Sequence, residues 1–578
     1  MSAEGTSSAM SGLARLVAEA RRRTQPVRDF VARGLAKIDP CEDPDAEPLG
    51  LLPLIALTWA IVYSLSLYWR FKFQPMQDVG HHVGLSAVVA DWGRPGSMYT
   101  ELYDWPNPLN ANALLYTFAG YLGKLIPITF AFRLGMSVYL AGVPLANLYA
   151  LRVFGRSAWP AILAVPLAYN MNYVAGFANL LFAAPFFVLS LPLLYRVLDR
   201  FTWKRFAAAA FVYVCVFLSH AHVFLWAGAL GATLTLATYF YRLFERDRTW
   251  LERIKGAWKA AGVSALTVTP SLLLFARWYD WAFGSGKTEG AVQTVTSGLD
   301  QGFGAYFKPP QGLWHDLGMY ALKLYITDED LNLMWKLGLL VAVALAFARF
   351  ATWKKPPVME IAFALTVGSY FVLPEAIDSN PVVGSRQMGI ALWLLPAAVV
   401  PLPAKVSRLA RWIVILGTLV FVRQFFVAWV QHLVKFERTE AAGLEWVLDA
   451  APKRQHLHLV KIMNDYSTIF TWRPNWHVEK YYMADKLGQV ADNPAIVSTS
   501  SIRYKKGIDP HRITAHGPDW ASWANVWEWN ELVLVHGWVP TPAQLEEAKK
   551  HGRRIRKEGD WELWRRHGDW ETGDPESK

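Results

Sequence analysis

Cysteine is nearly absent from this chain of 578 residues, which contains only Cys41 and Cys215. Two cysteines, one of them inside an apolar run, exclude a disulfide framework. Charged residues are also scarce, because Asp, Glu, Lys and Arg make up 18% of the chain, against about a quarter in soluble proteins. The first 48 residues lack a short apolar core before a small-residue cleavage site, so no cleavable signal peptide is expected.

Motifs of soluble nucleotide-dependent enzymes are missing as well. The chain has no phosphate-binding Walker loop, no dinucleotide-binding glycine pattern after a strand and no Gly-x-Ser-x-Gly nucleophile turn. The net charge of +11 could indicate nucleic acid, but membrane proteins gain Lys and Arg in their cytoplasmic loops. We therefore expect no nucleotide cofactor and no nucleic-acid partner.

The chain is rich in apolar sequence. Hydrophobic residues make up 53% of it, and the mean hydropathy is +0.17. They fall in blocks of about 17–22 residues, the length at which a helix crosses ~30 Å of hydrocarbon. This pattern predicts a polytopic α-helical membrane protein with about eleven spans. The predicted spans are residues 50–69, 134–153, 157–172, 178–196, 204–220, 222–242, 258–277, 332–351, 358–374, 387–403 and 411–431.

The distribution of Lys and Arg predicts the orientation of these spans. With residue 1 in the cytoplasm, the connections on that side contain basic clusters. The short connections on the other side, 170–178, 219–222 and 374–386, contain a single basic residue, Arg386. A further apolar stretch, 110–130, would reverse this asymmetry if it spanned, so we expect a juxtamembrane or re-entrant helix there.

Three segments of different composition follow from this topology. Residues 1–48 are expected to form a basic cytoplasmic segment on the membrane surface. Residues 49–435 form the membrane domain, with long outer loops at 70–133 and 278–331. Residues 436–578 form an extracytoplasmic, water-soluble domain, since an odd number of spans precedes them.

The C-terminal segment predicts a small α/β domain. Its expected strands are 456–462, 495–499, 531–536 and 560–565, and its expected helices are 439–450, 478–487 and 541–557. Eight tryptophans crowd its second half, and a core and membrane-interface role is favoured over stacking on sugar rings. They are Trp520, Trp523, Trp527, Trp529, Trp538, Trp561, Trp564 and Trp570.

Polar side chains gather at the predicted outer ends of the spans, where ionisable groups are costly to bury and are functional candidates. Four separate segments place acids, imidazoles, amides and one guanidinium at the same depth, which predicts a functional site. The candidates are Asp78, His82, Asn170, Asn172, His220, His222, Asp378 and Arg386.

Each candidate also has a purely structural interpretation. Asp78 could cap the helix that begins near His81, and Arg386 could extend toward the membrane surface as an isolated cation. His81 and His82 are neighbours on a helix and point about 100° apart, so at most one of them faces a given site. The histidines suggest a divalent metal, but no metal-binding spacing supports one, and we expect no metal cofactor.

Several short motifs follow the first predicted span in a set order. They are Asp78-x3-His82, Asp91-Trp92-Gly93, Trp105-Pro106-Asn107-Pro108, Arg133, Leu151-Arg152-Val153-Phe154-Gly155-Arg156, Leu218-Ser219-His220, and Arg386 before Leu395-Pro396. Their order, over about residues 50–431, resembles that of the GT-C superfamily of membrane glycosyltransferases, and Leu218-Ser219-His220 is similar to a motif of its uncharacterised bacterial branches. In that family a long outer loop with juxtamembrane helices and an early acidic residue follows the first span. Many members also have an acid in the second outer loop, where this chain has Asn179.

This resemblance implies transfer of a sugar from a polyprenyl-phosphate donor to a glycan, lipid or protein acceptor. The reaction would take place on the outer face of a bacterial inner membrane, with inversion at the anomeric carbon. Asp78 would be the general base, Arg386 would neutralise the departing phosphate, and the other candidates, His82 and His220 first, would position the substrates. The C-terminal domain would select the acceptor.

Two other functions stay open. A secondary transporter would also place charges at membrane level, but it should contain internal repeats and broken helices, and no repeat is visible. A non-catalytic GT-C-shaped subunit of a cell-envelope assembly would keep the helices without the chemistry, and Asn179 favours that alternative.

Overall fold

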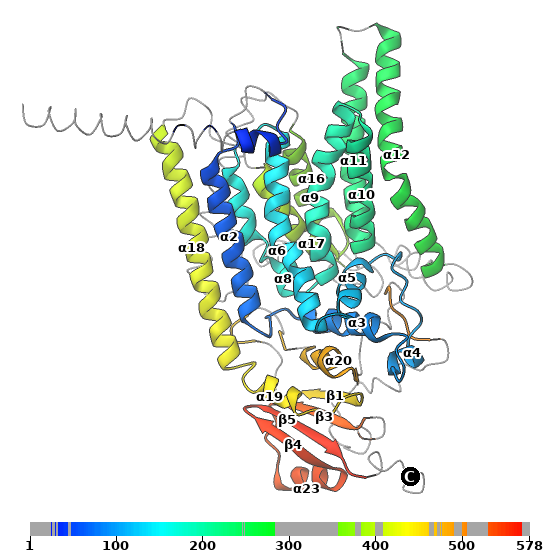
Figure 1. Cartoon of the computed structure of the whole chain (residues 1–578), viewed down its shortest axis with the longest axis vertical. Helices are drawn as coiled ribbons and strands as arrows, with labels where there is room; N and C mark the ends of the chain where they lie inside the picture. The colour runs from blue at the N-terminus through cyan, green and yellow to red at the C-terminus, as the bar shows by residue number, and fades with distance from the viewer. Residues whose placement is uncertain are drawn as a thin grey trace, which may run out of the picture.

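A bundle of helices stands above a small mixed sheet in the computed structural model of this chain (Figure 1). The structure describes residues 33–43, 48–245, 249–283, 357–375, 383–398, 408–461, 467–470, 474–475, 477–490, 500–505 and 530–568, with a few single residues between them. The predicted span 332–351 and the predicted strand 495–499 lie outside these residues.

Six helices within the described residues are long and apolar enough to cross a membrane. They are α2 (Leu51–Arg70), α6 (Ile128–Val153), α9 (Ala178–Asp199), α11 (Ala221–Leu243), α12 (Trp250–Phe283) and α18 (Arg408–Arg438). Three shorter helices pack in the same bundle, namely α10 (Trp203–Ser219), α16 (Val358–Val372) and α17 (Val383–Ala398). The chain is therefore a mostly helical membrane protein, and the count of eleven spans stays a prediction.

The predicted span 157–172 is not one helix, and this prediction was wrong. The segment forms a 3-10 turn, η1 (Trp159–Leu163), followed by the short helices α7 (Ala164–Leu167) and α8 (Met171–Val174). Asn170 interrupts it with extended backbone angles, and its side chain accepts a hydrogen bond from the Asn172 amide. A side chain that bonds its own backbone competes with the helix, and the irregular backbone is tolerated because protein buries it.

The segment between α2 and α6 contains three short helices, α3 (Val79–Asp91), α4 (Met98–Leu102) and α5 (Leu114–Leu122). Within the apolar stretch 110–130, only the nine residues of α5 form a helix before α6 begins. Nine residues rise about 14 Å, less than half of the ~30 Å of hydrocarbon, so α5 is too short to span. The helix α6 begins at Ile128 rather than at residue 134.

Two buried ion pairs fix the end of the bundle that is farther from the sheet. Arg152 is 2% exposed, and its guanidinium binds both carboxylate oxygens of Asp39 at 3.0 and 2.7 Å. Arg156 binds both oxygens of Glu360 at 2.9 and 2.8 Å. Because hydrogen bonds between charged groups are short and strong, the two pairs tie residues 33–43 and α16 to the end of α6.

The sheet has five strands in the order β2-β1-β3-β5-β4. Strand β1 pairs in parallel with β2 and β3, whereas β5 is antiparallel to β3 and β4. The elements of the C-terminal domain are α19 (Leu444–Asp449), β1 (His456–Lys461), η4 (Val478–Lys480), α20 (Tyr481–Lys486), β2 (Gln489–Val490), β3 (Leu532–His536), α23 (Pro542–His551), β4 (Gly552–Glu558) and β5 (Trp561–Arg566).

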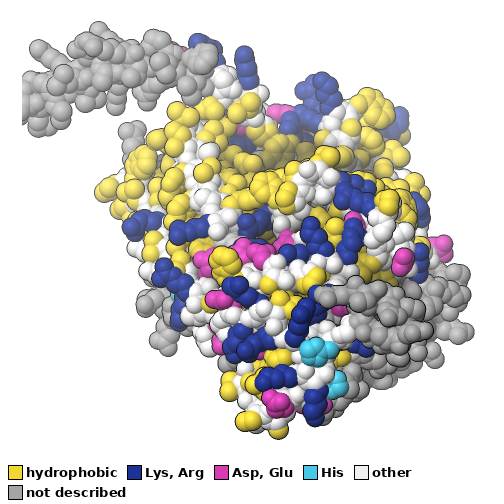
Figure 2. All heavy atoms as spheres, turned by 60° about the horizontal axis from the view of Figure 1, so that its bottom comes forward, with side chains coloured by type: hydrophobic (Ala, Val, Ile, Leu, Met, Phe, Trp, Pro, Cys, Tyr) yellow, Lys and Arg dark blue, Asp and Glu magenta, His cyan; other side chains and the backbone are white. Residues whose placement is uncertain are grey.

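The two faces of the sheet belong to different cores, because successive residues of a strand point to opposite faces. Leu532 and Leu534 of β3 join the large core that continues into the helical bundle. Val533 and Val535 pack instead with Trp564 in a separate cluster covered by α23. Figure 2 shows the resulting surface, with hydrophobic side chains over the helices and charged side chains over the C-terminal domain.

Of the eight tryptophans in the second half of this domain, the four that the structure describes are buried, which agrees with a role in its core. Trp527, Trp538, Trp561 and Trp564 are each no more than 6% exposed. The other four predicted tryptophans, Trp520, Trp523, Trp529 and Trp570, lie outside the described residues.

The expected helix 541–557 is only half helical. A capping box of Thr541 and Gln544, with proline at the first helical position, starts α23. The helix stops at Gly552, whose φ of −160° and ψ of 168° are extended, and the chain continues as the edge strand β4 beside β5. The periodicity of the sequence missed this switch because basic residues fill an exposed edge strand as well as a helix surface.

Candidate functional site

Asp78 lies between α2 and α3, and backbone contacts set its position. Its amide donates to the Ala175 carbonyl at 3.1 Å, and the Gln77 amide donates to the Val174 carbonyl at 2.8 Å. Gly176, with φ of 78°, lies so close that a Cβ there would overlap the Asp78 backbone. The carboxylate makes no capping hydrogen bond to α3 and is 24% exposed, so it is accessible at the end of the bundle nearer the sheet.

The two histidines of α3 face different partners. Nδ1 of His82 lies 2.7 Å from the Tyr116 hydroxyl of α5. Burial lowers the pKa of the His82 imidazole to about 3, so this ring is neutral at physiological pH. His81 faces His477 of the C-terminal domain, and their ring centroids are 3.5 Å apart. His82 thus belongs to the bundle side of α3 and His81 to the domain side.

His220 and His222 lie at the break between α10 and α11. The extended backbone of His220, with φ of −161° and ψ of 117°, separates the two helices by a single residue. Nε2 of His222 lies 2.9 Å from Nε2 of Gln387 in α17. His82, His222 and Arg386 all interact electrostatically with His220, so α3, the α10–α11 break and α17 meet at this point.

Arg386 lies in the first turn of α17. Its guanidinium lies over the Phe177 ring, 4.2 Å from the ring centroid, and its Nε has no hydrogen-bond partner among the described residues. The carboxylates of Asp78 and Glu375 interact with it electrostatically. The Glu375 carboxylate also accepts hydrogen bonds from the backbone amide and the hydroxyl of Ser385 at 3.0 and 2.7 Å. These bonds connect Glu375 to the first turn of α17.

Asn170 and Asn172 hold the backbone of α17. The side-chain amide of Asn170 donates to the Gly389 carbonyl at 3.1 Å, and the side-chain amide of Asn172 donates to the Arg386 carbonyl at 3.2 Å. A Cβ on Gly389 would overlap the Asn172 side chain, so this approach requires glycine. These contacts position Arg386, and a direct role of either asparagine in substrate binding stays a prediction. Asp378 lies outside the described residues.

Asn179, at the place where an acid was expected from the resemblance, makes a structural contact. Its amide donates to the carbonyl of Asn112 at 3.0 Å. Asn112 adopts a φ of 63°, which asparagine tolerates better than most residues. The side-chain oxygen of Asn112 also accepts a hydrogen bond from the backbone amide of Ala221 at 3.3 Å. Ala221 lies between His220 and His222. Asn112 and Asn179 therefore hold the start of α11 beside α5 and α9.

Sequence reasoning missed a charged cluster of the C-terminal domain beside Asp78. Nε2 of His477 lies 3.8 Å from the Asp78 carboxylate, and Nδ1 of His477 lies 3.1 Å from Nζ of Lys480. Nζ of Lys480 lies 2.6 Å from the Glu479 carboxylate. Three ionisable residues in four positions were the available signal, but the segment 478–487 was interpreted only as a helix. Figure 1 shows α20, which follows this cluster, between α3 and the sheet.

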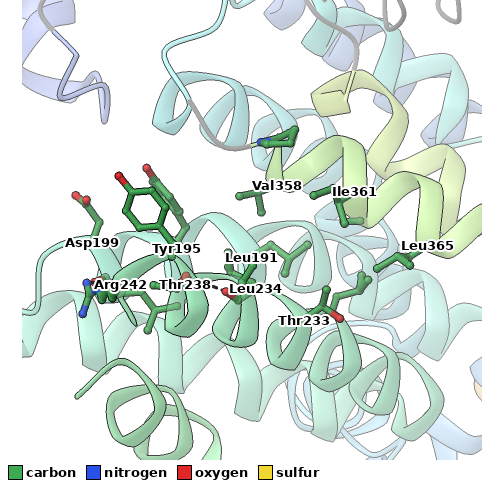
Figure 3. A pocket seen from close by; sticks show the side chains of 16 residues that line it. Leu191, Tyr195, Asp199, Thr233, Leu234, Thr238, Arg242, Val358, Ile361 and Leu365 are labelled. Atoms are coloured by element: carbon green, nitrogen blue, oxygen red, sulfur yellow. Dashed lines mark hydrogen bonds between the residues drawn. The ribbon is translucent and has the colours of Figure 1, made fainter. Parts of the chain in front are cut away.

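A described cavity lies elsewhere in the bundle. Its volume is about 450 Å³, and mainly apolar side chains of α9, α11 and α16 line it, with Asp199 and Arg242 at one end (Figure 3). The lining comes from the later part of α9, whereas the start of α9 lies beside Asn112 near the candidate site. The cavity includes none of the predicted site residues.

In the part of the chain that the structure describes, no group of three or more His, Cys, Asp or Glu residues is arranged to hold a metal ion.

No protein-family model and no curated protein matches this sequence. Among solved structures, the chain is similar to the archaeal oligosaccharyltransferase AglB from Archaeoglobus fulgidus, in complex with an inhibitory peptide and a dolichol-phosphate. The identity is 11%, the alignment covers 87% of this chain and 73% of that one, and the TM-score is 0.42. This likeness assigns no activity, so the function must follow from the residues of the chain itself.

Proposed function

We propose that this protein is a membrane glycosyltransferase that moves a sugar from a polyprenyl-phosphate carrier to an acceptor at the membrane surface. The observation that carries the proposal is the convergence of Asp78, Arg386 and three histidines, His82, His220 and His222, from separate segments. A carboxylate that can take a proton lies within electrostatic range of a guanidinium that can bind a phosphate. Sugar transfer from a lipid phosphate needs both functions.

The reaction would balance as a single displacement. The acceptor hydroxyl gives its proton to the Asp78 carboxylate while its oxygen forms a bond to the anomeric carbon. The bond between that carbon and the phosphate oxygen breaks, and its electron pair leaves with the polyprenyl phosphate. Arg386 neutralises the charge that develops on the phosphate, and Asp78 then releases its proton to water. Attack opposite the leaving group gives inversion at the anomeric carbon.

The remaining polar groups would orient the substrates. A neutral His82 imidazole has one N–H donor and one acceptor, as required for hydrogen bonds to a hydroxyl or a phosphate oxygen. His220 and His222 contribute from the helix break, and the C-terminal domain, which contacts α3, would present the acceptor. We place the reaction on the outer face of a bacterial inner membrane, because the basic clusters favour a cytoplasmic position for the opposite ends of the helices.

The proposal is tested with the purified full chain in lipid nanodiscs. Short-chain polyprenyl phosphates carrying radiolabelled sugars are supplied with candidate acceptors, and release of polyprenyl phosphate and labelling of the acceptor are measured together. We expect coupled release and transfer for one sugar. Donor binding without transfer for any sugar or acceptor would favour the non-catalytic subunit instead, consistent with the structural use of Asn179. Solute uptake into proteoliposomes, without donor binding, would favour a transporter.

The orientation is tested separately, by cysteine labelling in intact cells. Single cysteines at the exposed positions Lys204 and Arg553, in a chain with Cys41 and Cys215 replaced by serine, should react from opposite sides of the membrane. An impermeant maleimide should label Arg553→Cys in intact cells and Lys204→Cys only after lysis. Labelling of both before lysis would mean that the predicted span parity is wrong.

A further inference from the structure

The C-terminal domain reaches Asp78 through the segment that begins at His477. Two glycines of α3 permit this approach. A Cβ on Gly80 would overlap the His477 carbonyl, and a Cβ on Gly84 would lie 2.9 Å from Sδ of Met483. Glycine at these positions therefore brings the backbone of the C-terminal segment directly against the helix that follows Asp78.

Two further contacts fix the same interface. The guanidinium of Arg454 binds both oxygens of the Asp91 carboxylate at 3.2 Å, and Asp91 is fully buried. The hydroxyl of Tyr99 donates to the carbonyls of Met483 and Gly488 at 3.2 and 2.7 Å. These bonds join the last residue of α3 and the next helix, α4, to the domain, so the position of His477 relative to Asp78 is set by the fold.

A line of polar contacts runs from Asp78 into the domain. The His477 ring has its Nε2 3.8 Å from the Asp78 carboxylate and its Nδ1 3.1 Å from Nζ of Lys480. Lys480 is fully buried, and Glu479 supplies its counter-charge at 2.6 Å. The His477 side chain is 8% exposed, so water does not compete freely for either ring nitrogen.

The lysine decides which nitrogen of His477 bears the proton. An ammonium has three N–H donors and no acceptor, so Nδ1 of His477 must accept the hydrogen bond from Lys480. A neutral imidazole whose Nδ1 accepts has its proton on Nε2. This is the nitrogen that faces Asp78. A second proton on Nδ1 would put two donors against each other, so Lys480 opposes the imidazolium form.

We infer that His477 is a positioning residue for Asp78, held by Lys480 in the tautomer that presents its Nε2–H to the Asp78 carboxylate. The inference rests on the proposed function, in which Asp78 is the base. A distance of 3.8 Å is too long for a direct hydrogen bond, and such contacts commonly shorten when substrate binds. Among the residues that the structure describes, His81 of α3 and Glu479 of its own segment also face this ring.

The first test compares His477→Ala with His477→Gln. A glutamine amide can place an N–H donor near the position of Nε2, whereas alanine cannot. The alanine variant should lose about tenfold to a hundredfold in kcat with little change in the KM for the donor, because only the alignment of the base is disturbed. The glutamine variant should recover most of that loss. The control is His567→Ala, at an exposed position of the C-terminal domain.

The second test removes the ammonium and its counter-charge together. The double variant Glu479→Gln/Lys480→Met is neutral and similar in size, so no unpaired charge remains buried. Nδ1 of the His477 ring then has no ammonium to accept from, so either neutral tautomer can form. Transfer by the double variant should therefore fall toward the rate of His477→Ala. A transfer rate equal to that of the wild-type protein would overturn the inference.

The third test needs no activity. Nitrogen NMR of the full chain with ¹⁵N-labelled histidine, with the His477 signals assigned by their loss in His477→Ala, should show a protonated Nε2 and an unprotonated Nδ1. The opposite tautomer would overturn the inference even if the protein transfers sugar. If the tautomer is as expected but no donor supports transfer, the proposed function fails while the local geometry holds. If transfer occurs and His477→Ala is as fast as wild type, the positioning role fails alone.

Discussion

Replacing Asp78 by asparagine will lower the rate of sugar transfer about 10²- to 10⁴-fold. The amide has nearly the same size as the carboxylate, but it cannot take a proton from the acceptor hydroxyl. The fold should survive, because the position of Asp78 depends on its backbone hydrogen bond to Ala175 and on Gly176, which the substitution leaves unchanged. The measurement is the initial rate of polyprenyl-phosphate release at saturating donor, with the purified protein in nanodiscs.

The control for this variant is Asp104→Asn, an exposed carboxylate in the same loop region, which should transfer at the wild-type rate. Donor binding and the thermal midpoint of Asp78→Asn should stay close to wild type. A transfer rate within a factor of three of wild type would show that Asp78 is not the base of the reaction. A variant that no longer binds donor would show a role in the ground state rather than in proton transfer.

Replacing Arg386 by lysine or alanine will lower turnover about 10²- to 10³-fold. The planar guanidinium can hold two phosphate oxygens at once, which a lysine ammonium cannot match in geometry. Charge grows on the leaving phosphate in the transition state, so the contact should strengthen there. Arg386→Lys should therefore slow turnover more than it weakens donor binding, and Arg386→Ala should do both. Single-turnover rates and donor titrations separate the two effects.

Arg423→Ala is the matched control, because this arginine is exposed on α18, outside the candidate site. It should leave donor binding and turnover unchanged. If Arg386→Ala keeps both within a factor of two of wild type, the guanidinium only packs on Phe177, where its contact distance is 4.2 Å. The phosphate would then have to bind elsewhere, and His220 and His222 are the next groups to replace.

The regular elements follow from local sequence patterns. The apolar blocks near residues 50–69 and 178–196 became α2 and α9, since a helix in a membrane must satisfy its own backbone hydrogen bonds. The short apolar run at 531–536 became β3, with its two faces in two cores. These patterns are readable because each depends on residues only a few positions apart.

The local patterns failed where a distant contact or a side-chain bond changed the backbone. The Asn170 side chain interrupts the predicted span 157–172. Its oxygen accepts a hydrogen bond from the backbone amide of Asn172, and its nitrogen donates to the Gly389 carbonyl of α17. The predicted helix 541–557 ended at Gly552 because the backbone from this residue onward forms hydrogen bonds with the antiparallel strand β5. Hydropathy and periodicity describe only neighbouring residues. They cannot predict a hydrogen bond to the Gly389 carbonyl or pairing with β5, because these partners are brought close only by folding.

Local patterns of residues were enough to predict a helical membrane protein and the polar groups at one end of its helices. Apolar block length specifies the helices, and Asp78, the histidine pairs and Arg386 were recognisable as costly polar groups near them. Two further features became visible only in the folded chain. Asn172 positions Arg386, and His477 lies beside Asp78 although about four hundred residues separate them. The close packing of α3 against the C-terminal domain depends on glycines in α3 and on buried hydrogen bonds between the two segments. These two surfaces fit each other only after the chain has folded, so no local pattern of residues predicts their contact.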